Sequence, residues 1–342
     1  MVICGDGMTE DGSDRDQQAR SSRDQGSLTL RPRVPGDDAG IVEIYTRQEA
    51  DSEPLTIALY RAEQAEKVAD RQGEQWVAVE TSRVVGVGSL APAWWTGRPG
   101  IYAVHIRIDQ NHWRRGIGTR LYGLLRSRLI ALGATRLVSW VRVDAANGRR
   151  FAARHGFRET GEVVEQYRLH VPEANAEAYG GLEERLRRGG LRIASLAELG
   201  TEDELFLRAL QRLWASSGDE PPDPERLRGS FPAWRREVLQ AAGLSPETHW
   251  VALDGERPVG MTFLKQLSED AAENDYTGVA PTHRGRGIAP ALKLRAIAWA
   301  RQHGVRWFYT SSEIGNTRMI AINRRLGYQP GVRRLEVSRD LP

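Results

Sequence analysis

Cysteine and long apolar runs are nearly absent from this sequence of 342 residues. The single cysteine, Cys4, has no partner for an internal disulfide and cannot build a Cys-based zinc site, so we predict no metal and a reducing, cytoplasmic location. No segment has the roughly 18 consecutive apolar residues of a membrane span. Residues 1–27 lack the apolar run of a signal peptide and have the polar composition of a disordered tail, so no membrane partner is expected.

Lysine is also scarce, and arginine supplies most of the positive charge. Only Lys67, Lys265 and Lys293 are lysines, and the formal net charge is +3. This mild bias suits an anionic small ligand. The arginines alternate with acidic residues and do not cluster with aromatic ones, which argues against a nucleic-acid partner.

Two common phosphate-binding motifs are missing, but a short glycine motif occurs twice. The chain has no GxxxxGK[ST] for a nucleoside triphosphate and no GxGxxG after its first strand for a dinucleotide. It does contain HWRRGIGTRL at 112–121 and HRGRGIAPAL at 283–292. In each copy, further glycines follow the motif's central glycine after 17 and 40 residues. These glycines are Gly116, Gly133 and Gly156 in the first copy, and Gly287, Gly304 and Gly327 in the second.

The repeated spacing predicts a duplicated domain. We place the first copy at 28–170, a linker at 171–190 where apolar periodicity fades, and the second copy at 191–342. Each copy has an opening strand, a helical stretch, a two-strand hairpin, a further strand, the glycine loop and an amphipathic helix. In the second copy that further strand ends at Val279. This order of elements predicts an α/β fold in which each sheet is flanked by helices.

The glycine loop joins a strand to a helix, which is a favourable place for phosphate. Unpaired backbone N–H groups and the helix dipole meet there. Gly285 and Gly287 allow the backbone to approach an anion closely, and Arg284 and Arg286 can add charged contacts. A tight turn that merely caps the helix is the alternative.

The stretch VAPTHRGRGIAPAL, followed by NTRMIAINRRLGY, resembles the GCN5-related N-acetyltransferases, the GNAT superfamily. The pyrophosphate loop of that superfamily has the pattern [Q/R]-x-x-G-x-[G/A], which Arg284, Gly287 and Ala289 fit. In the first copy Gly116 and Gly118 match, but Trp113 occupies the Q/R position. Arg114 and Arg115 are the basic residues of that first loop. The tandem layout is similar to that of the mycothiol synthases.

The resemblance implies that each copy forms a twisted mixed sheet that splays after the fourth strand, and that acetyl-CoA binds in the gap. The pyrophosphate would lie on the loop and the pantetheine arm along the strand that ends at Val279, with Asn316 near the arm. Helix capping is the alternative role of Asn316, and Ala145 is its counterpart in the first copy. The implied reaction is direct attack of an amine on the thioester, which requires a base and an acid.

Family bases lie four and six residues before the end of the fourth strand, which gives Asp275 and Glu273. The alternative is a solvated acidic loop. The same spacing gives Val104 and Tyr102 in the first copy, and strand alternation predicts that His105 points to the opposite face.

The tyrosine that serves as the family's acid is missing from both copies. Asn323 and Ala152 occupy its positions. Asn323 could still hydrogen-bond the sulfur or the substrate, whereas Tyr276, Tyr309 or water would have to supply the proton.

Because these departures concentrate in the first copy, we expect the second copy to be the catalyst. The leading hypothesis is an acetyl-CoA-dependent N-acetyltransferase that acts on a small-molecule or peptide amine. The rival is a catalytically silent acyl-CoA-binding sensor or scaffold. We expect the acceptor to be selected by 214–238, with Trp94 and Trp95 lining the first copy. The working unit is either a monomer with pseudo-dimeric halves or a homodimer.

Overall fold

The structure, a computed structural model, describes residues 28–69, 73–200, 203–217 and 231–342. The tail predicted over residues 1–27 lies outside these ranges, as does the middle of the segment expected to select the acceptor. No helix among the described residues is long and apolar enough to cross a membrane.

The two copies fold with the same order of elements. The N-terminal half contains β1 (Thr29–Pro32), α1 (Asp38–Gln48), α2 (Ile57–Ala69), β2 (Glu74–Glu80), β3 (Arg83–Pro92), β4 (Ile101–Ile108), α3 (Ile117–Ala131), β5 (Arg136–Arg142), α4 (Ala146–Arg154) and β6 (Arg158–His170). The C-terminal half contains α5 (Leu182–Arg188), β7 (Leu191–Ser195), α6 (Leu196–Leu199), α7 (Glu204–Ser216), α8 (Phe231–Trp234), β8 (His249–Asp254), β9 (Arg257–Gln266), β10 (Ala271–Val279), α9 (Ile288–Gln302), β11 (Trp307–Glu313), α10 (Thr317–Leu326) and β12 (Gln329–Asp340).

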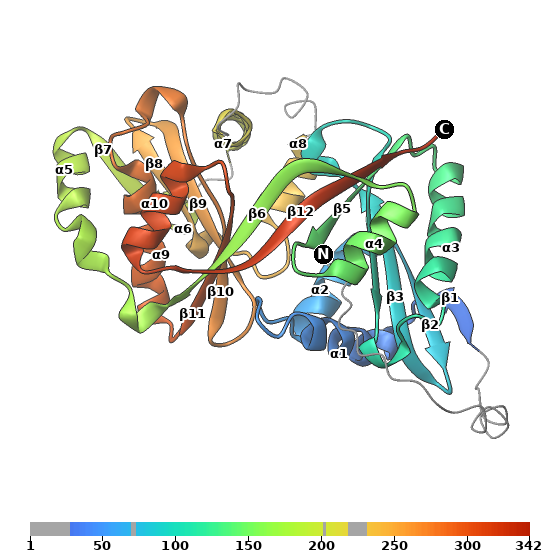
Figure 1. Cartoon of the computed structure of the whole chain (residues 1–342). Helices are drawn as coiled ribbons and strands as arrows, with labels where there is room; N and C mark the ends of the chain where they lie inside the picture. The colour runs from blue at the N-terminus through green and yellow to red at the C-terminus, as the bar shows by residue number, and fades with distance from the viewer. Residues whose placement is uncertain (1–27, 70–72, 201–202, 218–230) are drawn as a thin grey trace, which may run out of the picture.

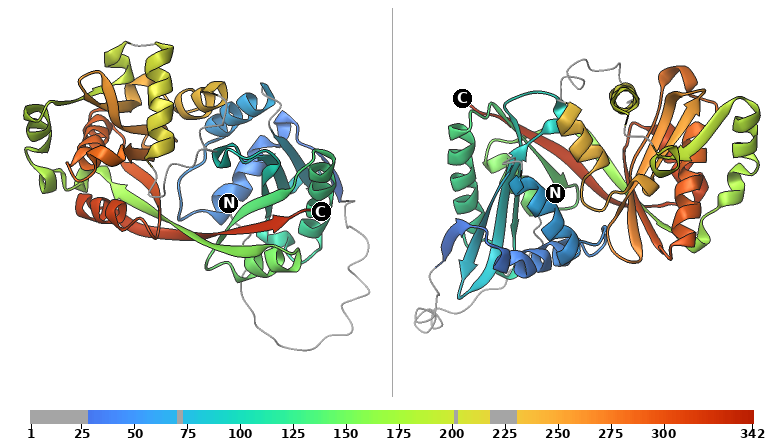
Figure 2. Two further views of the ribbon diagram at one scale, coloured as in Figure 1. Left: turned by 90° about the horizontal axis from the view of Figure 1, so that it is seen from above. Right: turned by 180° about the vertical axis from the view of Figure 1, so that it is seen from behind.

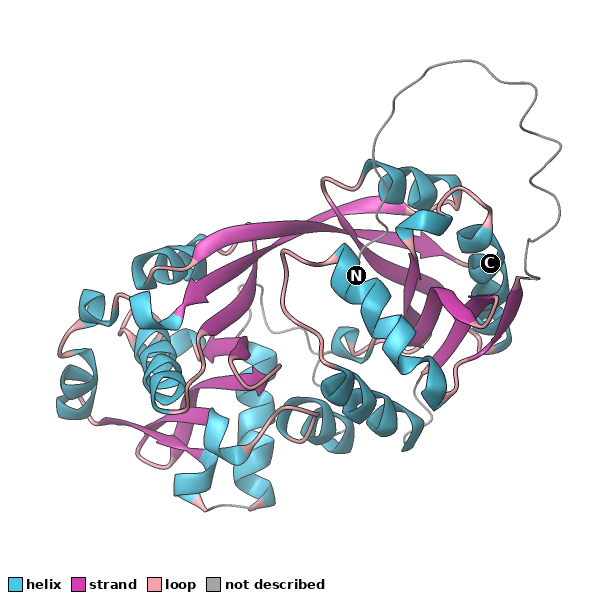
Figure 3. Ribbon diagram, turned by 90° about the horizontal axis from the view of Figure 1, so that it is seen from below, coloured by secondary structure: helices cyan, strands magenta, loops and turns pink. Residues whose placement is uncertain are grey.

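The last strand of each copy belongs to the sheet of the other copy (Figure 1). β6 pairs with β11 of the C-terminal half, and β12 pairs with β5 of the N-terminal half. β6 and β12 also pair with each other, so one twelve-stranded sheet runs in the order β1-β2-β3-β4-β5-β12-β6-β11-β10-β9-β8-β7. The two sheets expected from the sequence are thus continuous, and the long strands arch across both halves in Figure 3.

The exchanged strands also complete the hydrophobic cores. Tyr167 and Leu169 of β6 are buried in the core of the C-terminal half. Val337 of β12 packs with Val141 and Ala152 of the N-terminal half. Full burial of one such side chain contributes about 1.5–3 kcal/mol. The core of each half therefore includes side chains from the other sequence copy, and the β6–β12 pair joins the halves in both views of Figure 2.

Several local predictions are confirmed. The two-strand hairpin predicted in the second copy is β8–β9, which turns after Asp254, and β10 ends at Val279 as expected. The amphipathic helix predicted after the second glycine loop is α9, which buries Leu292, Ile297 and Ala300.

Residues 171–190, expected to be a linker, contain two 3-10 helices and α5. Leu182 and Leu186 of α5 are buried in the core of the C-terminal half.

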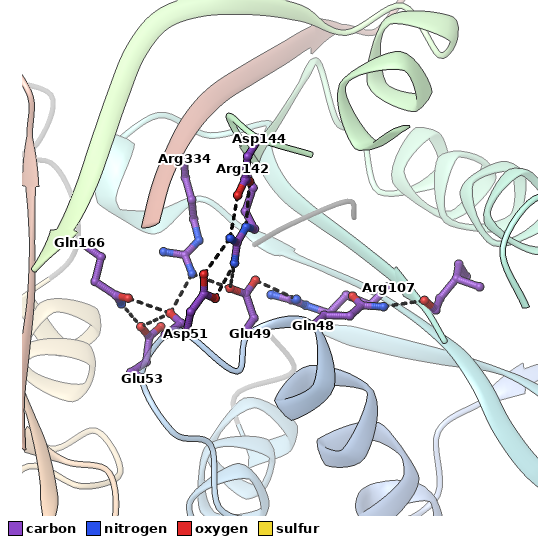
Figure 4. A network of polar contacts seen from close by, with 11 residues as sticks. Gln48, Glu49, Asp51, Glu53, Arg107, Arg142, Asp144, Gln166 and Arg334 are labelled. Carbon is purple, nitrogen blue, oxygen red and sulfur yellow. Dashed lines mark hydrogen bonds and ion pairs between the residues drawn. The ribbon is translucent and has the colours of Figure 1, made fainter. Parts of the chain in front are cut away.

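A buried carboxylate ties the segment after α1 to three strands (Figure 4). Glu49 accepts hydrogen bonds from Arg107 of β4 and Arg334 of β12, each at 2.9 Å, and Arg142 of β5 lies 3.7 Å away. Burial alone would raise the pKa of Glu49, but the charges of Arg107 and Arg334 outweigh burial and lower it. The exchanged strand is therefore held electrostatically as well as by its sheet hydrogen bonds.

We predict that Glu49→Gln lowers the free energy of unfolding by about 3 kcal/mol at neutral pH, because it leaves two buried guanidinium groups without their carboxylate. The pKa of Glu49 is lower in the folded state than its usual value of 4.5. Its contribution is therefore complete above pH 4.5 and is lost as the pH falls through the folded pKa. Urea denaturation at several pH values measures this. Glu43→Gln, at an exposed ion pair with Arg47, is the control and should cost no more than about 0.5 kcal/mol. Equal effects of the two variants would contradict the role of Glu49.

Candidate active site

The central strands separate in both halves, as the fold requires for a ligand between them. β4 pairs with β5 only through residues 101–103, and β10 pairs with β11 only through residues 271–273. Beyond these points each strand has an edge without a partner strand. In the N-terminal half, Ser139 Oγ donates a hydrogen bond of 2.8 Å to Val104 O across the opening.

The two glycine loops have closely similar backbones. Gly116 and Gly287 precede α3 and α9 with φ of +78° and +87°, a left-handed conformation that glycine adopts without strain. Gly285 has φ of +75°, and Arg114 takes the same conformation at the equivalent position with φ of +61°. Both loops therefore present their N–H groups in the same way at the start of a helix.

Trp113 contacts the end of its strand in the same way as Arg284, the residue at the equivalent position of the second loop. Its indole Nε1 donates a 2.8 Å hydrogen bond to Ile108 O at the end of β4. Arg284 Nε makes the corresponding contact, 3.5 Å long, with Val279 O at the end of β10. The departure from the family pattern at Trp113 thus leaves the loop anchored to its strand.

The first loop opens onto a large, positively charged cavity of about 1070 Å³. A Cβ atom on Gly116 would meet no heavy atom within 4 Å. Among the described residues, no carboxylate forms a hydrogen bond or an ion pair with Arg114 or Arg154. The lining residues are Ile106, Arg107, Ile108, His112, Trp113, Arg114, Gly116, Ile117, Gly118, Thr119, Asn147, Arg150, Phe151 and Arg154.

This cavity leads inward to the place where β4 and β5 separate. A small inner cavity shares Ile106 and Phe151 with the large one. Its other lining residues are Val104, Tyr122, Ser139, Ala152, Phe157 and Val337. The inner cavity has a volume of only about 10 Å³, so the open space at the Gly116 loop narrows sharply between β4 and β5 before it reaches Ser139.

The equivalent path in the C-terminal half is filled by side chains. Leu182 of α5 lies over the second loop, where a Cβ atom on Gly287 would be 2.7 Å from Leu182 Cδ1. Lys293, which replaces Tyr122, is buried, donates a hydrogen bond of 2.6 Å to Asn274 Oδ1 and lies over the ring of Tyr328. Asn323 is fully buried beside Ser312. This geometry differs from the expectation that the second copy binds the cofactor.

The remaining residues predicted for the cofactor are partly committed to protein contacts. Asn316 Oδ1 caps α10 by accepting a hydrogen bond from the Met319 N–H. Arg115 forms two hydrogen bonds with Glu80. Arg286 extends toward Gly189 O at 3.5 Å, and Ala289 packs against the core of the C-terminal half.

A second opening lies between the two halves, on the other face of β4. Two adjoining cavities of about 410 and 510 Å³, here called the central cleft, share residues from both halves. The shared residues are Glu63, Gln64, Gln75, Ser89, His105 and Lys265. Arg107 lines both the central cleft and the large cavity at the Gly116 loop, so β4 lies between the two openings.

Glu273 and Asp275 both reach the central cleft, as alternation predicted, but the strand is irregular there. A β-bulge at Asp275 shifts the register between Asn274 and Tyr276. The correspondence of Asp275 with Val104 was therefore wrong, since β4 has no such bulge and Val104 matches Asn274. Bulges are common next to active sites and re-aim side chains.

The two carboxyl groups share a partly desolvated environment. Burial raises the pKa of Glu273 well above its usual value, and the nearby Asp275 and Glu53 raise it further. Burial also raises the pKa of Asp275, although Lys265 and His249 oppose this effect. Lys265 in turn pairs with Glu63 at the cleft wall.

His105 is the residue that the sequence interpretation undervalued. Its side chain lies in the central cleft, whereas Val104 and Ile106 face the inner cavity. His105 points away from Val104, as predicted, and the face on which His105 lies is the wall of the central cleft. The alternation of β4 correctly places His105 on the face opposite Val104. Only the position of the C-terminal half shows that this face lines a cleft.

Tyr276 and Tyr309, the two tyrosines considered as acids, do not line the inner cavity between β4 and β5. Tyr276 donates a hydrogen bond to Trp214 O and contacts Ser217, and Tyr309 lines the central cleft. Trp94 and Trp95 also border the cleft, and Trp94 stacks on Trp214. The described residues include no group of three or more His, Cys, Asp or Glu side chains that could hold a metal ion.

The profile of the acetyltransferase (GNAT) family matches residues 40–157 and 207–328, more than half of the chain. The chain belongs to this family. It is a tandem GNAT protein and an acyltransferase, with one family segment in each half.

Curated relatives support the same family. The chain is 25% identical to a mycothiol acetyltransferase of Corynebacterium glutamicum (strain R) over 224 residues, which cover 65% of this chain and 70% of the relative. It is 27% identical to a mycothiol acetyltransferase of Geodermatophilus obscurus over 225 residues, covering 63% and 66% of the two chains.

Solved structures share the tandem fold at low identity. A tandem GNAT protein from the clavulanic acid biosynthesis pathway superposes with a TM-score of 0.68 at 17% identity, covering 92% of this chain and 98% of the other. A GCN5-related N-acetyltransferase from Sphaerobacter thermophilus gives a TM-score of 0.64 at 17% identity, covering 92% and 95%. These similarities establish the fold of both halves together.

We predict that the buried Lys293 amine makes stability depend on pH. Burial lowers its pKa to about 7 from a usual value of 10.5, so the unfolded chain binds more protons between these values and stability rises with pH there. In Lys293→Met that rise, up to ~1.4 kcal/mol per pH unit, should disappear. Urea denaturation between pH 7 and 9 measures the slope. Lys265→Met is the control, since the pKa of Lys265 is raised and the slope should persist. A wild-type slope in Lys293→Met would show that the amine stays charged.

Proposed function

We propose that this protein transfers an acetyl group from acetyl-CoA, bound in the N-terminal half, to a primary amine of a small molecule or peptide bound in the central cleft. The observation that carries the proposal is the contrast between the two copies. The space at the Gly116 loop is open and narrows toward Ser139, whereas Leu182 covers the Gly287 loop and Lys293 and Tyr328 fill the core behind it. The acyl donor site is thus assigned to the copy with more departures from the family motif.

The first loop suits the phosphates of the donor. The N–H groups around Gly116 and Gly118 lie at the start of α3, where the helix dipole favours anions. Arg114, Arg150 and Arg154 surround the same space and supply charge. The pantetheine arm would lie along the free edge of β4. Its thioester would then lie near Ser139.

The amine would arrive from the other face of β4, through the central cleft. We propose that His105 accepts the proton of the attacking amine, because it projects from β4 between Val104 and Ile106, which face the donor path. Glu273 and Asp275 would bind the amine end of the acceptor from the C-terminal half. Catalysis by these two carboxylates stays a prediction, and on this assignment they act mainly on the KM for the amine.

Calorimetric titration of acetyl-CoA tests the donor site. We expect one binding event per chain, which Gly116→Glu abolishes because it adds bulk and negative charge in the loop. Gly133→Glu is the matched control, since Gly133 also has a left-handed φ of +74° and open space around it, but it lies beyond the end of α3. Arg286→Glu in the second loop should leave the affinity unchanged. Binding that survives Gly116→Glu, or that Arg286→Glu abolishes, would overturn the assignment.

Release of the CoA thiol tests transfer, with glucosamine, putrescine, lysine and a short peptide with a free N-terminus as acceptor probes. With the best acceptor, His105→Gln should lower kcat about 10²–10⁴-fold, the range typical of general acid–base catalysis. His303→Gln, at an exposed position after α9, should retain activity. An unchanged kcat in His105→Gln would exclude His105 as the base, and binding without transfer to any amine would favour a silent acyl-CoA-binding protein.

A further inference from the structure

The missing family tyrosine leaves the sulfur of the leaving thiol without its usual proton donor. Ala152 occupies that position on α4 and lines the inner cavity. The only tyrosine among the residues that line this inner cavity is Tyr122, which reaches it from α3. No sequence motif marks Tyr122, because the family pattern places the phenol one helix later.

The hydroxyl of Tyr122 is held by a residue from the far end of the chain. Arg339 of the exchanged strand β12 donates a hydrogen bond of 2.7 Å from Nη1 to Tyr122 Oη and also contacts His155 O. The ring of Tyr122 packs against His155, Phe151 and Phe157, with centroids 4.5, 6.5 and 5.9 Å away. These contacts fix both the ring and the oxygen.

The proton of that hydroxyl is available. Tyr122 Oη accepts the hydrogen bond from Arg339, and no described residue accepts one from it. Burial raises the pKa of Tyr122, opposed by the charges of Arg339 and Arg126, so the phenol is protonated at neutral pH. The neighbouring His155 is kept neutral, because burial and the charges of Arg339 and Arg154 lower its pKa.

We infer that Tyr122 is the general acid of the transfer and that Arg339 is its positioning residue. The inference rests on the proposed function. As the amine nitrogen bonds to the thioester carbon, the carbon–sulfur bond breaks with its electron pair on sulfur, and the Tyr122 proton moves to that sulfur. The amine proton passes to His105 and then to water. Arg339 stabilises the phenolate until a proton returns from water in the open cavity.

Tyr122→Phe removes the proton and little volume. With acetyl-CoA and the best acceptor, we expect kcat to fall about 10²-fold, while the Kd of acetyl-CoA stays within about 2-fold. Tyr328→Phe is the control, because Tyr328 is a buried tyrosine in the filled half, at the position that corresponds to Phe157, and its kcat should be unchanged. Arg339→Gln should lower kcat without raising the KM for the amine.

A measurement without turnover separates catalysis from structure. In the complex with CoA, the Tyr122 O–H would donate to the bound sulfur and stabilise its thiolate. The pKa of the bound thiol, followed by thiolate absorbance, should therefore be lower in the wild type than in Tyr122→Phe. Equal thiol pKa values together with an equal kcat would overturn the role of Tyr122 and leave the proposed function intact. Absence of acetyl-CoA binding or of transfer in the wild type would instead refute the proposed function.

Discussion

The exchange of β6 and β12 is the constraint on which the rest of the molecule depends. Each strand lies between the two halves and pairs with the other, which makes a single sheet from two sequence repeats. Exchange of an identical element is the usual route to a swapped dimer. Here it occurs within one chain, so the halves are fixed relative to each other and the cleft between them has a defined wall. The Glu49 ion pairs reinforce this junction where β12 meets β4 and β5.

The two halves share a backbone but differ in the space that their side chains leave open. Both keep the splayed strands and the left-handed glycine that opens the helix. The N-terminal half keeps the space between them, and the C-terminal half has filled it with Lys293 and Tyr328. In exchange, the C-terminal half presents Glu273, Asp275 and Lys265 to the cleft. A filled core on one side gives the rigid wall against which an acceptor can be positioned.

Local features could be predicted from the sequence, and features set by distant contacts could not. The glycine spacing, the β8–β9 hairpin and the end of β10 at Val279 follow from residues close together in the chain. Whether a loop is open depends on Leu182, which no motif connects with Gly287. The bulge at Asp275 changes a register that the spacing alone would have kept. Motif matches alone therefore predicted that the C-terminal copy binds acetyl-CoA, whereas we propose the N-terminal copy from the geometry of the loops.

Arg339 and Leu341 complete the N-terminal half although they stand at the end of the chain. Domains commonly fold in order as they leave the ribosome. This half is incomplete at that stage, because its sheet lacks the strand next to β5 until β12 has been synthesised. Contacts of such large sequence separation also slow folding, since the loop-closure entropy is lost before the contact forms. The nascent N-terminal half would thus expose the edge of β5 throughout translation of the second copy, and protection of that edge becomes a requirement for producing the protein in the cell.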